Sequence, residues 1–88
     1  MKLKEGFVLR KVADTYIVVA VGEEAKQYNV MIKLNDSGAM LWEKLTAGAQ
    51  KSELVSAFLD TYDIDEETAK EDVEAFIQKL SSHNLLCD

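Results

Sequence analysis

The 88-residue sequence contains no proline, one cysteine and one histidine. A single cysteine cannot form an intrachain disulfide, so we expect a protein of the reducing cytoplasm. Every apolar run is much shorter than the roughly 18 residues that a membrane-spanning helix needs. The first residues also lack the apolar centre of a signal peptide. These absences argue against a secreted or membrane-embedded protein.

The residues that usually carry catalysis or bind metals are also scarce. His83 and Cys87 are the only residues of their types, and both lie near the C-terminus. Two ligands do not make a closed metal site, and neither residue belongs to a nucleophile, base and orienting-group pattern. The four glycines are scattered and form no phosphate-binding loop. We therefore expect no metal, no cofactor and no enzymatic activity.

Acidic residues outnumber basic ones by sixteen to ten, which gives a net charge of −6. Apolar residues make up 48% of the chain and charged residues 30%, as in an ordinary globular domain. A chain of this length buries about 60–65% of its unfolded surface, enough for one modest core. We expect a single domain over residues 1–88. The acidic balance disfavours nucleic-acid binding, which depends on clustered Lys and Arg.

The N-terminal part of the chain is rich in β-branched and aromatic residues, which favour strands. The pattern predicts strands over residues 7–12, 16–21 and 28–34. Short connections between them indicate an antiparallel meander. The second strand is apolar almost throughout, so we place it at the centre, with the first and third strands at the edges. In the third strand, Ile32 and Leu34 share the buried face by period-two alternation.

From Asn35 onward the apolar period becomes helical. It predicts a helix that begins at Asn35 or Asp36 and ends by Gly48, a second helix over residues 51–62, and a third from the cap Asp65 to near Ser82. Asn84 can then turn the chain so that the last leucines fold back. The predicted core includes Trp42, Leu45, Phe58 and Ile77. The predicted fold class is α+β, with a three-stranded antiparallel sheet followed by three helices on one of its faces.

An edge strand offers unpaired backbone groups to a partner unless something covers them. The third strand is the notable edge, since Met31 lies at its middle and only Asn29 and Lys33 are polar deterrents. One possibility is that the third helix or a second copy covers it, giving a homodimer through the edge strand. The other is that it captures an extended peptide as a fourth strand.

The segment from Leu34 to Trp42, Leu-Asn-Asp-Ser-Gly-Ala-Met-Leu-Trp, followed by Leu45 and Gly48, resembles the signature of the PqqD-like family. The likeness extends over essentially the whole chain. It includes Tyr62-Asp63-Ile64-Asp65 between helices and the terminal Leu85-Leu86. The chain departs from the family at Gln50, where a capping Ser or Thr is common, and at Asn84, where Gly is common.

This resemblance implies a winged helix-turn-helix-like, non-catalytic module for precursor peptides of ribosomally made, modified products. Such a module holds the leader segment of the precursor and presents it to a modifying enzyme, frequently a radical SAM protein. Mapped onto this chain, the resemblance implies a peptide-binding groove between the third strand and the third helix. The implied groove residues are Tyr28, Asn29, Val30, Met31, Ile32 and Lys33 of the strand and Asp72, Ala75, Phe76 and Lys79 of the helix.

Other interpretations remain open for these residues and for the protein. Phe76 can be a plain core residue, and Asp72 and Lys79 can belong to a solvated helix face. A protein–protein adaptor would use the same strand edge. A small winged-helix DNA-binding regulator is less favoured, because residues 65–80 contain six acidic and two basic residues, a net charge of −4 on the helix that would approach phosphates.

Overall fold

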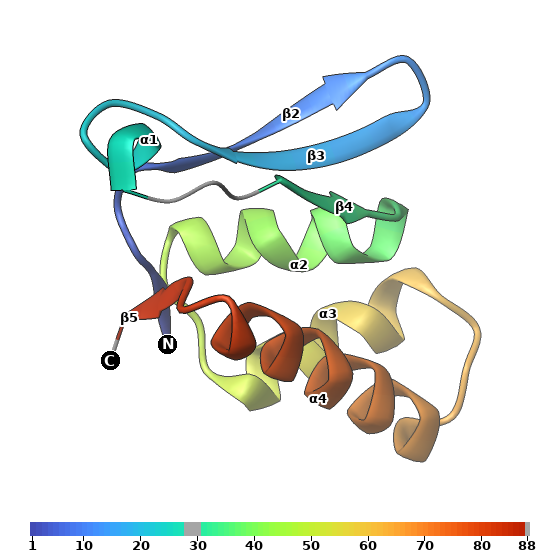
Figure 1. Cartoon of the computed structure of the whole chain (residues 1–88). Helices are drawn as coiled ribbons and strands as arrows, with labels where there is room; N and C mark the ends of the chain where they lie inside the picture. The colour runs from blue at the N-terminus through green and yellow to red at the C-terminus, as the bar shows by residue number, and fades with distance from the viewer. Residues whose placement is uncertain (28–30, 88) are drawn as a thin grey trace.

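The computed structural model describes residues 1–27 and 31–87 (Figure 1). The predicted order of three strands followed by three helices is confirmed. The strands are β1 Lys2–Leu3, β2 Phe7–Val12, β3 Thr15–Ala20, β4 Met31–Leu34 and β5 Leu86–Cys87. The helices are α1 Glu24–Gln27, α2 Asp36–Thr46, α3 Lys51–Thr61 and α4 Glu66–Ser82.

The main sheet is antiparallel with the order β2-β3-β4, so the prediction of a central second strand is confirmed. A two-residue turn joins β2 to β3, with Ala13 in the left-handed region at a φ of 56°. Val18 of β3 is fully buried and pairs with Leu9 on one side and Ile32 on the other. Because paired residues lie on the same face of a sheet, one apolar face of all three strands packs against the core.

Helix α2 lies against the sheet, and α3 and α4 lie beyond it (Figure 1). Trp42 is 2% exposed and Leu45 is fully buried, which confirms their predicted place in the core, and Phe58 is also buried. Ile77 differs from the prediction, because it is partly exposed and packs against the margin of the core. On α4 it lies beside the row of residues that includes Val73 and Leu80, both of which are fully buried.

The starts of the three long helices are held by local hydrogen bonds. The Asn35 side chain accepts from the amide of Gly38 at 2.8 Å, and Asp65 accepts from the amide of Thr68 at 2.8 Å. The hydrogen bonds from Thr68 lower the pKa of the Asp65 carboxyl below its ordinary value. At α3, the Glu53 carboxylate accepts from the amide of Gln50 at 2.9 Å, so the helix is capped without Ser or Thr.

The two ends of the chain meet in a second sheet that the sequence pattern did not predict. Strand β1 pairs antiparallel with β5, and the amide of Lys4 donates to the carbonyl of Leu85 at 2.8 Å. Asn84 takes the predicted turn with a φ of 58°, and Leu85 is fully buried. Two-residue strands carry no periodic signal, which is why only their pairing reveals them.

Four further observations bear on the sequence predictions. The connection between the second and third strands contains the single-turn helix α1 instead of an irregular loop. The third strand was predicted over residues 28–34, of which residues 28–30 lie outside the described part. Cys87 lies exposed in β5, and the described residues contain no group of three or more possible metal ligands. None of the described helices is long and apolar enough to cross a membrane.

Candidate functional site

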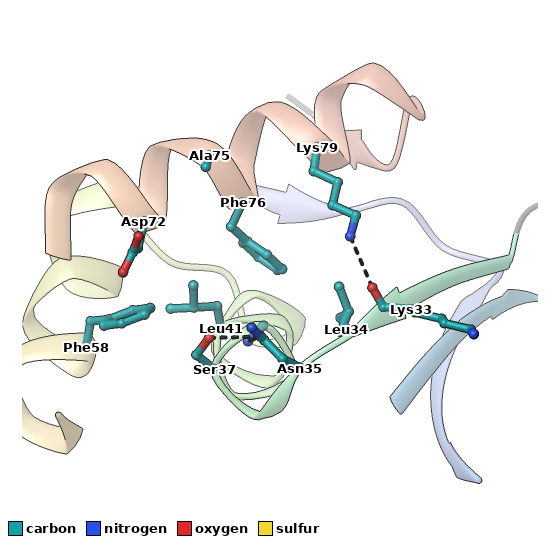
Figure 2. A pocket seen from close by; sticks show the side chains of 11 residues that line it. Lys33, Leu34, Asn35, Ser37, Leu41, Phe58, Asp72, Ala75, Phe76 and Lys79 are labelled. Carbon is teal, nitrogen blue, oxygen red and sulfur yellow. Dashed lines mark hydrogen bonds between the residues drawn. The ribbon is translucent and has the colours of Figure 1, made fainter. Parts of the chain in front are cut away.

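The free edge of β4 presents the backbone groups of alternate residues. The ammonium group of Lys79 on α4 donates a hydrogen bond to the main-chain carbonyl of Lys33 at 3.1 Å (Figure 2). That carbonyl therefore points away from β3. In an antiparallel strand the amide and carbonyl of one residue point the same way, and the direction alternates along the chain. Met31 and Lys33 thus face outward, whereas Ile32 and Leu34 face β3.

The pairing of β2 with β3 gives the same assignment independently. The amide of Val21 donates to the carbonyl of Gly6 at 2.8 Å, so this pair faces inward between β2 and β3. Alternation then turns the backbone groups of Val19 toward β2 and those of Val18 toward β4. Because Val18 pairs with Ile32, Ile32 must face inward. The amides of Met31 and Lys33 are the donors that this edge offers.

A hollow of about 420 Å³ lies beside this edge, between the end of β4, the start of α2 and one face of α4. Figure 2 shows α4 crossing over it, with the side chains of Phe76 and Lys79 directed into it. The residues that line it are Lys33, Leu34, Asn35, Ser37, Gly38, Leu41, Phe58, Asp72, Ala75, Phe76 and Lys79.

The base of the hollow is apolar and its margin is polar. Leu34, Leu41, Phe58 and Phe76 are all 8% exposed or less, so they form a rigid wall shared with the core. Asn35 lies at the margin, where its side chain is already occupied by hydrogen bonds from Gly38 and Ser37. The hollow thus combines an apolar base with an adjacent row of free backbone groups.

The charged groups of the hollow stand at opposite ends. Lys79 lies next to β4, and Asp72 lies two turns earlier on α4, beside Phe58 (Figure 2). The side chain of Asp72 makes no hydrogen bond or ion pair with any other residue in the described ranges 1–27 and 31–87. Lys33 contributes its backbone, because its own ammonium group points away from the hollow in Figure 2.

The structure brings together five of the predicted site residues around the hollow: Lys33, Asp72, Ala75, Phe76 and Lys79. The side chain of Met31 is 71% exposed, and its backbone lies on the free edge. Ile32 differs from its neighbours, because its side chain is 4% exposed in the core and its backbone faces β3. The remaining predicted residues, Tyr28, Asn29 and Val30, lie outside the described part of the chain.

Sequence reasoning missed the part of the wall that α2 and α3 supply. Leu34, Asn35, Ser37, Gly38 and Leu41 were interpreted as a strand end and a capped helix start, which they are, and they also line the hollow. Their position directly after the edge strand is a signal that these residues lie near its end. Phe58 gave no such signal.

Taken together, these features define a small α+β domain with one open sheet edge beside a helix and a hollow with an apolar base between them. The chain belongs to the PqqD family, whose model, described as coenzyme PQQ synthesis protein D, matches residues 15–86. No curated protein sequence matches the chain.

Two solved structures share the fold. One is described as TbiB1 in complex with the TbiA(beta) leader peptide, at 22% identity, with 100% of each chain covered and a TM-score of 0.79. The other is lasso peptide synthetase B1 complexed with the leader peptide, at 15% identity, with 99% of this chain and 96% of that chain covered and a TM-score of 0.76.

Proposed function

We propose that this protein is a non-catalytic, cytoplasmic peptide-binding module that captures the leader segment of a ribosomally made precursor peptide. The leader adds a strand to the free edge of β4, and its side chains enter the hollow beneath α4. The module then presents the rest of the precursor to a modifying enzyme. The PqqD-like resemblance favours an enzyme of the radical SAM class as this second partner.

The observation that carries the proposal is the outward backbone of Met31 and Lys33 on the free edge of β4, which ends at a hollow with an apolar base. Backbone hydrogen bonds to such an edge supply affinity, and neighbouring pockets supply side-chain preference. Both solved structures of this fold are described as complexes with a leader peptide, which supports the same use of the fold here.

A DNA-binding regulator, a protein–protein adaptor and a homodimer are the alternatives to leader capture. A DNA-binding regulator would bring α4 toward phosphates, yet this helix contains five acidic and two basic residues. An adaptor, or a homodimer formed through the edge strand, would use the same free edge without a leader peptide. The adaptor and the homodimer differ from leader capture only in the occupant of the β4 edge.

Proline substitution tests strand addition, because proline removes one backbone donor. Met31→Pro removes an outward amide, so we expect leader binding to fall at least tenfold while the fold is kept. Met31→Ala retains the amide and should bind like the parent. Lys11→Pro is the matched control: its amide faces outward by the same alternation, but on β2 at the opposite edge of the sheet. Ile32→Pro should instead damage the sheet, because its amide faces β3.

The measurement is fluorescence-polarisation titration with labelled leader segments of the short precursor peptides encoded near this gene, with circular dichroism to confirm folding. If a folded Met31→Pro variant binds as tightly as Lys11→Pro and the parent do, the leader does not add to β4. If the parent binds no leader but forms dimers that Met31→Pro dissociates, the edge serves self-association instead.

A further inference from the structure

The hollow contains one cationic and one anionic side chain, and neither is neutralised by an opposite charge. Lys79 donates only to the Lys33 carbonyl, and Asp72 has no partner in the described part of the chain. They are seven residues apart on α4, a helical rise of about 10 Å, which is too far for an ion pair with each other. Each charge is therefore available to a ligand.

The carbonyl group that accepts a hydrogen bond from Lys79 is also the acceptor that an added peptide strand would use. The Lys33 carbonyl faces outward from β4, so a peptide amide that pairs with this edge competes with Lys79 for it. Once displaced, the ammonium group remains beside the peptide with no acceptor of its own. A carboxylate on the bound peptide is the group that satisfies both its charge and its hydrogen bonds.

The geometry also sets the spacing and order of charges in the ligand. An extended peptide advances about 3.3 Å per residue, so the distance from Asp72 to Lys79 corresponds to about three residues. Side chains on the same face of a strand are two or four residues apart. Strand β4 runs from the Lys79 end of the hollow toward the Asp72 end (Figure 2). A peptide antiparallel to β4, as β3 already is, therefore passes Asp72 first and Lys79 second.

We infer that this groove selects extended peptides in which a basic residue precedes an acidic residue by two or four positions. The basic side chain meets Asp72, the acidic side chain meets Lys79, and the apolar base accepts the side chains between them. This inference rests on the proposed function and adds to it the charge pattern and the chain direction of the peptide.

The test starts from a displayed library of random peptides of about 12 residues, selected on the immobilised full-length protein. Only peptides whose binding is lost in Met31→Pro are counted, because these use the β4 edge. We expect the counted peptides to be enriched in the order basic then acidic, two or four positions apart. Exchanging these two residues within a selected peptide should weaken binding at least about fourfold. The exchange removes two attractions and adds two repulsions, and each of these four changes weakens binding by about 1.4-fold or more.

A charge-swapped protein provides the reciprocal test. The double variant Asp72→Lys with Lys79→Glu keeps the net charge, and both residues are exposed, so the fold should be retained. It should prefer the exchanged peptide over the original one. The matched control is Lys44→Glu with Asp60→Lys, which swaps the same charges in a separate concavity between α2 and α3. This control should keep the parental preference.

A single variant extends the test to one charge at a time. Lys79→Gln should lose the preference for the acidic residue and retain that for the basic residue. Counted peptides with no charge order, or with the acidic residue first, would overturn the inference and leave strand addition intact. A library that yields no peptide sensitive to Met31→Pro would overturn the proposed function itself.

Discussion

Phe76 offers a measurable test of how the hollow is built, because its ring belongs to both the core and the site. It is 8% exposed, it joins the core cluster, and it forms part of the apolar base of the hollow. Phe76→Ala removes this shared wall. The expected result is a loss of stability and a loss of peptide binding in one variant.

The magnitude follows from burial. Truncation of a buried Phe to Ala costs about 3–5 kcal/mol. The space left by Phe76 opens toward the solvent-filled hollow, so we expect a value near the lower end, about 3 kcal/mol. An 88-residue domain has a total stability of about 4–13 kcal/mol at typical values per residue. The variant should therefore fold with a much reduced margin. Phe76→Leu keeps most of the apolar volume and should cost about 1.5 kcal/mol or less.

Urea denaturation followed by tryptophan fluorescence measures these changes, because the chain has a single tryptophan, Trp42, which is 2% exposed. Leu59→Ala is the matched control, since Leu59 is 36% exposed on α3 and outside the hollow, and it should cost less than about 1 kcal/mol. A loss below about 1 kcal/mol for Phe76→Ala would refute the assignment of its ring to the core. Unchanged leader binding by the folded variant would refute its role in the hollow.

Two further predictions concern the core and a helix cap. Trp42→Ala should cost about 3–5 kcal/mol of unfolding free energy by urea denaturation, and a loss under about 1 kcal/mol would mean that the indole is not packed in the core. Hydrogen bonds from Thr68 lower the pKa of Asp65, so its stabilising effect is present above the ordinary pKa of 3.8 and is lost as pH falls through the lower folded value. Asp65→Asn keeps an acceptor for the cap but cannot titrate, so any melting-temperature advantage of the parent should disappear on acidification toward about pH 2 in circular dichroism. An advantage that is independent of pH would contradict this cap.

The main elements could be predicted because each carries a local signal. A nearly continuous apolar run indicates β3, and alternating apolar residues indicate β4. A 3.6-residue period with Asn35 and Asp65 as caps indicates α2 and α4. Residue type and local hydrogen bonding suffice for such elements. The Gln50 cap shows the limit, since only the contact with Glu53 reveals how α3 begins.

Apolar patterns alone predict the order of the three main strands and three long helices, the central strand and most of the core, because they indicate which face of each element must be buried. The tertiary structure is needed to identify the free backbone groups of β4, since their parity depends on register and not on residue type. It also decided the pairing of β1 with β5 and the meeting of Phe58, Phe76 and Leu41 around one hollow. Contacts between residues far apart in the chain leave no local pattern, so packing alone brings the Lys79 ammonium group of α4 to the Lys33 carbonyl of β4.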